Sequence, residues 1–221
     1  MTHKSCLAAA IAGTLVTSGI CSAGMILPGD LPDGVNQVML TVDGVDVTVT
    51  ANGGDAVFDT QNFNSVSGTG VAGGTFAEVD GQESMTFAFS VPVTLTQIGF
   101  AHVYPQGTFT ENDPVGESVI VTTDQGVFTF QPTSVNTGTW TGPGAVSNVD
   151  PGNSSGGGSW SIDGPDIIGL QITSITLTPG AGGTSTDDDD FSFTGLQFVP
   201  SPGSATMLAL AGAVTLRRRR N

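Results

Sequence analysis

The fold of this chain is decided by the stretch from Glu83 to Phe100, which reads ESMTFAFSVPVTLTQIGF. Alternation of apolar and polar residues with a period of two places the apolar side chains on one face of a β-strand. A Val91-Pro92 corner interrupts the pattern, because proline cannot donate a hydrogen bond to a strand ladder. The stretch therefore predicts a β-hairpin, with Met85, Phe87 and Phe89 before the corner and Val93, Leu95, Ile98 and Phe100 after it.

Two more hairpins are predicted on either side of this stretch. Residues 37–42 and 45–50 alternate apolar and polar residues and are joined by Asp43-Gly44, a dipeptide that favours a two-residue turn. Residues 119–130 repeat the pattern around a turn at Asp124-Gln125-Gly126. We therefore expect strand pairs that are local in sequence.

Two later apolar runs are also strand-like, residues 168–177 and 191–198. Their alternation slips between Ile172 and Ile175 and again at Gly195, which predicts bulges or bends. No stripe with a helical period occurs outside the two ends of the chain. These runs add to the hairpins and favour an all-β domain.

Two segments rich in Gly, Ser, Thr, Asn and Pro are predicted to be loops: residues 132–161, a long excursion, and the shorter 62–74. Many short strands with abundant glycine are typical of a two-sheet antiparallel β-sandwich, here of jelly-roll type. We expect this sandwich to occupy residues 24–198 as one domain. The sequence also predicts a signal helix before it and a short hydrophobic helix after it.

Charge is distributed very unevenly along the chain. All 20 acidic residues lie between Asp30 and Asp190, whereas the five basic residues are Lys4 and Arg217 to Arg220. So acidic a body repels nucleic acid and anionic lipid and attracts cations, which excludes nucleic acid as an expected partner. For most of these residues the favoured interpretation is a solvated acidic surface that keeps a secreted protein soluble.

The residue types of the body exclude several kinds of site. Residues 24–198 contain no Cys, Lys or Arg, and their one histidine is His102. A zinc site built on His or Cys, a lysine nucleophile and an arginine clamp are therefore excluded. A lone histidine in a strand-like run is more typical of a structural residue than of a catalytic base.

The first 23 residues have the pattern of a secretory signal peptide. Lys4 precedes an apolar run from Leu7 to Ile20, and Cys21-Ser22-Ala23 offers small residues for cleavage. We expect cleavage after Ala23. Both cysteines would leave with the signal, so the mature protein would contain no disulfide.

The last residues, 199–221, read VPSPGSATMLALAGAVTLRRRRN. Pro200, Ser201 and Pro202 precede an apolar stretch that would form a helix of roughly 20 Å, shorter than the hydrocarbon core of a bilayer. The following cluster of Arg217, Arg218, Arg219 and Arg220 favours a cytoplasmic C-terminus. A terminal amphipathic helix is disfavoured, because the stretch has no polar face.

This tail resembles the PEP-CTERM sorting signal of bacterial envelope proteins, with Pro200-Ser201-Pro202 in place of Pro-Glu-Pro. The same tail is also catalogued as an ice-binding protein C-terminal domain. The resemblance implies export by the Sec machinery, transient retention in the inner membrane and processing by an exosortase-type enzyme. It further implies delivery to the cell surface or to an extracellular exopolysaccharide matrix. We therefore expect an exported surface or matrix protein. The body contains no G-x-S-x-G elbow, phosphate loop or dinucleotide fingerprint, which favours a non-catalytic role.

Calcium is the cofactor that the acidic residues favour. Hard cations prefer carboxylate and carbonyl oxygens, and Asp187, Asp188, Asp189 and Asp190 form a dense run before the last strand. The spacing does not match an EF-hand, and a distant acid such as Glu78 or Asp80 would have to complete the site. The alternative is a solvated acidic turn.

Three aromatic residues are candidates for stacking on sugar rings: Trp140, Trp160 and Tyr104. An aromatic face suits the C–H side of a pyranose, and nearby polar residues suit its hydroxyls. The stretch from Glu83 to Phe100 also resembles strands of carbohydrate-binding-module-like sandwiches, which implies polysaccharide as a ligand. The alternative is that these rings fold back over the edge of the sandwich.

Two other functions stay open on the sequence alone. A glycoside hydrolase needs only a pair of carboxylates, for which Glu78, Glu83, Glu111 and Glu117 are the candidates. An ice-binding or adhesion protein needs a flat array of hydroxyls. For that function the T-x-T pairs are the candidates: Thr48 with Thr50, Thr94 with Thr96, and Thr176 with Thr178.

Overall fold

The computed structural model of the chain describes residues 22–73, 76–108, 116–153, 155–180 and 190–201. Within these ranges the regular structure is β-strand throughout, apart from one short 3-10 turn, η1 (Pro28–Asp30). The predicted all-β antiparallel sandwich is confirmed. The signal helix and the C-terminal helix predicted from the sequence lie outside the described residues. No helix within the described ranges is long and apolar enough to cross a membrane.

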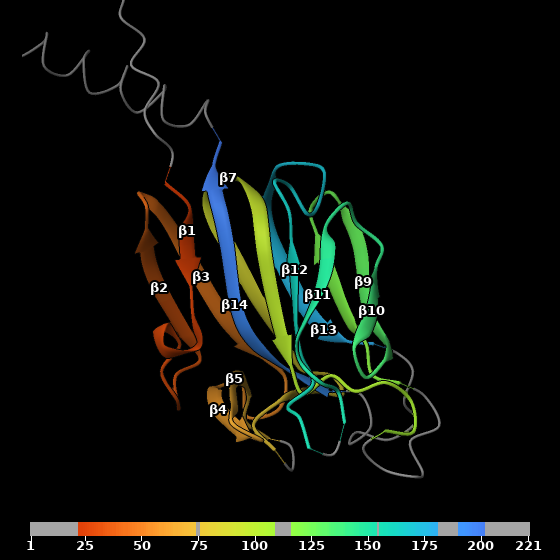
Figure 1. Cartoon of the computed structure of the whole chain (residues 1–221). Coiled ribbons are helices and arrows are strands. Elements are labelled where there is room, and N and C mark those ends of the chain that lie inside the picture. Colours follow the sequence, from red (N-terminus) through yellow and green to blue (C-terminus); the bar gives the residue numbers. More distant parts are fainter. Residues whose placement is uncertain (1–21, 74–75, 109–115, 154, 181–189, 202–221) are drawn as a thin grey trace, which may run out of the picture.

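The strands divide into two layers that share one long strand, β7 (Figure 1). The strand bounds are β1 (Gly24–Ile26), β2 (Gln37–Val42), β3 (Val45–Asn52), β4 (Phe58–Phe63), β5 (Val66–Val71), β6 (Val79–Asp80), β7 (Ser84–Ala101), β8 (Val119–Thr123), β9 (Gly126–Ser134), β10 (Thr137–Trp140), β11 (Ala145–Asp150), β12 (Ser159–Asp163), β13 (Ile172–Pro179) and β14 (Asp190–Pro200).

The two halves of β7 belong to different layers. Its first half pairs with β3 on one side and β13 on the other, and the order β2-β3-β7-β13-β8-β9-β10 makes the first sheet. Its second half pairs with β12 and β14, which are flanked by β11 on one side and by β1, β5 and β6 on the other. The second sheet is therefore built around the C-terminal half of β7.

The hairpin predicted at Val91-Pro92 is wrong, because β7 continues through this corner as one strand, Ser84–Ala101. The pairing of β13 with β7 skips from Ala88 to Val93, so the residues between them leave the ladder. Pro92 lacks an N–H and fits at such a break, and its carbonyl accepts a hydrogen bond from the N–H of Ser201 at 3.1 Å. An interrupted alternation is compatible with a turn and also with a strand that bends from one sheet into the other.

The other two predicted hairpins are confirmed as β2–β3 and β8–β9. Asp43 and Gly44 both have positive φ, 48° and 79°, as the two-residue turn requires. The predicted irregularities are present as well: register shifts occur between Ile172 and Ser174 and between Phe193 and Gly195.

The two segments predicted to be loops contain strands instead. Residues 132–161 include β10, β11 and the start of β12, and β12 is a central strand of the second sheet. Residues 62–74 include β5, which pairs with β4 and β14. In β12 only Trp160 and Ile162 are apolar, and their neighbours are two serines and an aspartate. So few apolar residues give a weak strand pattern in the sequence, so the sequence alone predicts a loop.

Aromatic rings join the two layers in the core. Phe130 of the first sheet lies 5.8 Å from Phe100 and 5.5 Å from Trp160 of the second, measured between ring centroids. Phe87 lies 5.1 Å from Phe193 in the same manner. All five side chains are buried. Each such ring pair adds about 0.5–1.5 kcal/mol beyond its buried area, so these contacts fix how the sheets face each other.

Candidate binding groove

A shallow groove of about 350 Å³ lies on the outer face of the second sheet. Its residues come from β1, the β4–β5 turn, β5, β7, β11, β12 and β14: Met25, Ser65, Val66, Ser67, Gln97, Gly99, Val149, Ser159, Trp160, Ser161, Thr194 and Gly195. None of these residues is charged. The groove is thus a neutral surface on a chain with a formal charge of −15.

Two glycines lie side by side in the floor of the groove. Gly99 of β7 is the Cα partner of Gly195 on β14 and of Ser161 on β12. A Cβ on Gly99 would lie 2.3 Å from Thr194 Oγ1, so the threonine hydroxyl covers the place that a side chain would take. A Cβ on Gly195 would meet only ordinary contacts at 3.6 Å, so a ligand can approach the backbone of the sheet at Gly195, beside the Thr194 hydroxyl.

A polar row lies beside the glycine row. Asp163, Gln97, Gln197 and Met25 are successive Cα partners across β12, β7, β14 and β1. The amide Nε2 of Gln97 donates a hydrogen bond to Ser161 Oγ at 3.0 Å, which links this row to the next. The floor thereby presents amide and hydroxyl groups that both donate and accept.

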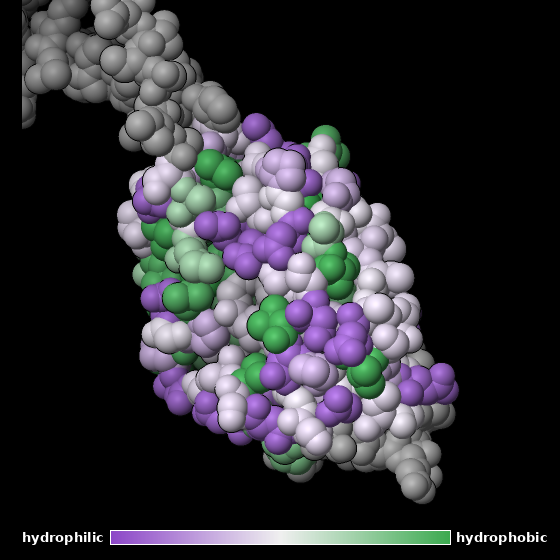
Figure 2. All heavy atoms as spheres, in the orientation of Figure 1, coloured by the Kyte–Doolittle hydropathy of each residue, from purple (hydrophilic) through white to green (hydrophobic). Residues whose placement is uncertain are grey.

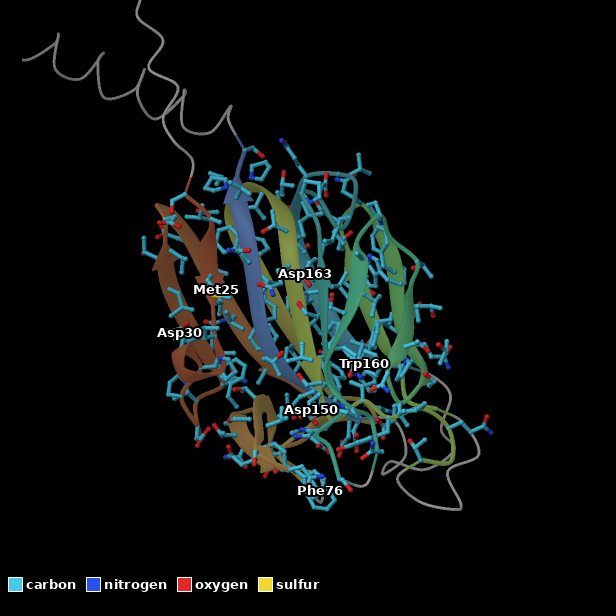
Figure 3. All side chains as sticks on the ribbon, viewed as in Figure 1. Met25, Asp30, Phe76, Asp150, Trp160 and Asp163 are labelled. Carbon is cyan, nitrogen blue, oxygen red and sulfur yellow. The ribbon has the colours of Figure 1, made fainter. Side chains whose placement is uncertain are left out.

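Exposed apolar side chains stand at opposite sides of the groove. Met25 on β1 is 43% exposed, and Val149 on β11 is 67% exposed. Figure 2 shows hydrophilic residues in the middle of this face with hydrophobic residues beside them. In Figure 3, Met25 lies on the β1 side of β14, and Asp163 and Trp160 lie on the β12 side. The arrangement combines a polar floor with apolar margins.

The three aromatic candidates do not form a common surface. Trp160 is 1% exposed and its Nε1 donates to Val103 O at 2.9 Å, and Tyr104 is 4% exposed. Burial, together with the carboxylates of Glu117 and Glu78, raises the pKa of Tyr104 far above its usual value. The exposed faces expected on Trp160 and Tyr104 are therefore absent, because both rings fill the core.

Trp140 lies on the first sheet, away from the groove. Its ring is partly buried and stacks on Phe128 at 5.6 Å, and its Nε1 donates to Ile167 O at 3.1 Å. This residue covers an edge of the sandwich, which was the alternative interpretation of the tryptophans.

The predicted calcium ligands fall largely outside the described residues. Asp187, Asp188 and Asp189 precede the described part of β14, and Asp190 is the Cα partner of Asp80 on β6. Among the residues that the structure describes, no group of three or more His, Cys, Asp or Glu residues is placed to hold a metal ion. Calcium binding stays a prediction.

Three of the four glutamates considered for hydrolysis are buried: Glu78, Glu83 and Glu117, with 6%, 3% and 8% exposed. Glu111 lies outside the described residues. Burial raises the pKa of Glu83 to about 7, and the hydrogen bond from Asp80 N–H opposes that change. These three side chains are buried, whereas no carboxylate lines the groove on the outer face.

His102 is a buried structural residue in this fold. Its Nδ1 lies 3.1 Å from Glu78 Oε1 and 3.0 Å from Ser192 Oγ, and the side chain is 2% exposed. Because both partners meet the same ring nitrogen, the three groups do not form a relay in which a base links an acid to a nucleophile. Instead they connect the end of β7 to β14 and to the residue before β6.

The first part of the sorting motif is attached to the sandwich. Pro200 ends β14 as the Cα partner of Val93, and Ser201 is 5% exposed. Pro202 and the arginines lie outside the described residues. The described chain is therefore packed on β7 as far as Ser201.

Comparisons with protein-family models, curated proteins and solved structures find no match for this chain. The candidate site is accordingly defined by the residues of the chain itself. The groove residues Gln97, Ser161 and Thr194 were not among the sequence candidates. The signal that could have found them is the isolated Gly99 and Gly195 within strand patterns, since such glycines mark close approach of a ligand or another backbone.

Proposed function

We propose that the chain is an exported, non-catalytic protein of the cell surface or extracellular matrix, which binds polysaccharide in the groove on its second sheet. The observation that carries this proposal is an uncharged groove in which the bare backbone of Gly195 lies beside the polar side chains of Thr194 and Gln97. Polysaccharides offer dense hydroxyls and apolar C–H faces. The groove offers complements to both.

The polar groups of the floor suit sugar hydroxyls. The Gln97 amide can donate and accept, and the hydroxyls of Ser161 and Thr194 can do either. Met25 and Val149 are placed to pack against C–H groups at the margins. Burial of Glu78, Glu83 and Glu117 supports a binding role over hydrolysis, because a general acid and a nucleophile must both reach the substrate.

Export and sorting are proposed from the two ends of the sequence. Residues 1–23 supply a Sec signal, and residues 199–221 supply the PEP-CTERM-like tail for an exosortase-type enzyme. The inner membrane is a transient location on this route, and exopolysaccharide is the partner at its end. An acidic body free of Lys and Arg supports the absence of nucleic acid among its partners.

Affinity electrophoresis of the full chain through gels that contain soluble polysaccharides tests the proposal. Retardation by at least one polysaccharide is expected, and Gln97→Ala should weaken it. Gln37→Ala is a matched control, because Gln37 Nε2 also donates to a hydroxyl, Thr50 Oγ1 at 3.0 Å, but on the other sheet. Equal loss in both variants, or no retardation by any polysaccharide, would contradict binding in the groove.

A second candidate function is favoured by a specific observation on the first sheet. Thr50, Thr86, Thr176 and Thr122 are successive Cα partners across β3, β7, β13 and β8. Thr86 Oγ1 lies 3.1 Å from Thr176 Oγ1. Thr50 and Thr176, one member each of two predicted pairs, thus fall into one row of hydroxyls, as an ice-binding or adhesion surface would need. The predicted pair of Thr94 and Thr96 is not part of this row, because it lies on the second half of β7. Thermal hysteresis that is lost in Thr122→Asp would support this candidate, and its absence in the unaltered chain would reject ice binding.

A further inference from the structure

The charges around the groove limit which polysaccharides it can hold. Its lining residues are uncharged, and Asp163 stands at the end of the neighbouring polar row as the Cα partner of Gln97. No Lys or Arg occurs between Ser5 and Leu216, so no cationic side chain of the body can neutralise an anionic ligand. A uronic or sulfated polymer would therefore meet only like charge.

The floor of the groove favours a flat ring. Gly195 carries no side chain, so its backbone is bare in the floor of the groove, and the Thr194 hydroxyl beside it covers Gly99. A pyranose can lie on this bare patch while its hydroxyls reach the amide and the threonine hydroxyl at the edges. The exposed Met25 and Val149 can then contact neighbouring sugar units on either side.

An extended peptide fits this surface poorly. Peptides that bind to sheets add a strand to a free edge, because main-chain hydrogen bonds supply their affinity. The C-terminal half of β7, which forms the floor, is paired with β12 on one side and with β14 on the other. The floor of the groove offers no free edge.

We propose that the groove selects uncharged glycan chains and rejects anionic ones, with Gly195, Thr194 and Gln97 determining the fit. This inference rests on the proposed function and narrows it to one ligand class. Selection is electrostatic at long range and steric at the glycine floor.

The charge arm of the test compares polymers with the same backbone. Hydroxyethyl cellulose with carboxymethyl cellulose, and dextran with dextran sulfate, serve as probes for the full chain in affinity electrophoresis. Retardation by a neutral polymer but not by its anionic counterpart at low salt is expected. Equal or stronger retardation by the anionic polymer would overturn the inference and leave polysaccharide binding intact, whereas retardation by no polysaccharide would overturn both. Binding of glycan-free peptides by the chain, with no retardation by any polysaccharide, would also overturn both the inference and the proposed function.

The steric arm uses glycine variants. A Cβ on Gly195 would lie 3.6 Å from Ile26 O and from Leu27 Cδ2, an ordinary contact, so Gly195→Ala should preserve the fold. Gly29→Ala is the matched control, because a Cβ on Gly29 meets nothing within 4 Å and Gly29 does not line the groove. Weaker retardation by the neutral polymer is expected for Gly195→Ala only. Unchanged retardation would overturn the role of the glycine floor.

Thr194→Val keeps the inference testable if Gly195→Ala lowers the melting temperature. Valine keeps the shape of threonine and removes its hydroxyl. About tenfold weaker binding of the neutral glycan is expected, the factor that corresponds to one lost hydrogen bond of ordinary strength. Unchanged binding with an unchanged melting temperature would overturn the assignment of Thr194.

Discussion

Glu83 and Asp80 hold each other through two hydrogen bonds. Glu83 Oε2 accepts from the backbone N–H of Asp80 at 3.1 Å, and the backbone N–H of Glu83 donates to Asp80 O at 2.7 Å. A Cβ on Gly54 would lie 1.8 Å from Glu83 Oε1, so the carboxyl also packs tightly against the β3–β4 loop. Glu83 therefore joins the β6–β7 turn to a loop that is distant in sequence.

The free energy of unfolding should fall as the pH rises from the ordinary pKa of a glutamate to the raised pKa of Glu83. Burial, and the nearby carboxylates of Asp80 and Asp55, raise the pKa of Glu83 from 4.5 to about 7. Between these values the folded state binds a proton that the unfolded state has lost, so the free energy of unfolding decreases from about pH 4.5 to about pH 7. The decrease should stay below about 3 kcal/mol after solvent screening. Urea unfolding at a series of pH values measures it.

Glu83→Gln should flatten this pH dependence, because glutamine does not titrate. Asp124→Asn is the control and should leave it in place. Although burial tends to raise the pKa of Asp124, hydrogen bonds from the Thr173 hydroxyl and N–H lower it overall, so Asp124 titrates below that window. A slope that persists in Glu83→Gln would assign the effect to another group.

Phe130→Ala should destabilise the sandwich by about 3–5 kcal/mol, the usual cost of a cavity left by a buried phenylalanine. Phe130 is fully buried and contacts Phe100 and Trp160 of the opposite sheet. Phe76→Ala is the matched control, because Phe76 is 60% exposed (Figure 3) and should change stability by less than about 0.5 kcal/mol. Equal effects in a urea titration would contradict the placement of Phe130.

Gly24→Val should detach β1. A Cβ on Gly24 would lie 2.9 Å from both Phe198 Cζ and Val42 Cγ1, which real Cβ atoms do not tolerate. Because Met25 lines the groove, loss of β1 should also weaken the proposed binding of polysaccharide. Faster amide exchange at residues 24–26 with little change in the core strands would verify the effect. Unaltered exchange would show that the neighbouring side chains can give way.

Calcium binding can be measured by calorimetry and thermal melting of the full chain at matched ionic strength. The calcium hypothesis predicts stoichiometric binding and a rise in melting temperature, both abolished by Asp→Asn changes at Asp187 to Asp190. A rise that sodium reproduces at equal ionic strength would instead reflect screening of carboxylate repulsion. Absence of saturable binding would remove the hypothesis.

Local signals predicted the fold better than long-range ones. Asp43-Gly44 specifies its turn through residues that tolerate positive φ, so the β2–β3 hairpin could be read directly. Pro92 specifies only that a ladder is interrupted. Whether the chain then turns back or enters the second sheet depends on β12 and β14, which are far away in sequence.

The groove could not be predicted for a similar reason. Gly99 and Gly195 become neighbours only through the pairing of β7 with β14, and each glycine alone indicates no more than a bulge or a close approach. Exposure of tryptophans was likewise inferred from the composition around them. Trp160 is buried because β12 directs Trp160 and Ile162 to the core and the serines that alternate with them to the other face. The Gly- and Ser-rich composition of this segment does not indicate that alternation.

The antiparallel pairing of β1 with β14 places Gly24 opposite Phe198, so the described chain enters and leaves the sandwich at the same pole (Figure 1). On the proposed export route, both hydrophobic ends would hold this pole toward the lipid, and the loops around Phe76 would face outward. If either end were removed, the remaining end would keep the molecule in the same orientation relative to the membrane. The orientation of the sandwich relative to the envelope would thus not depend on which of the two ends is processed first.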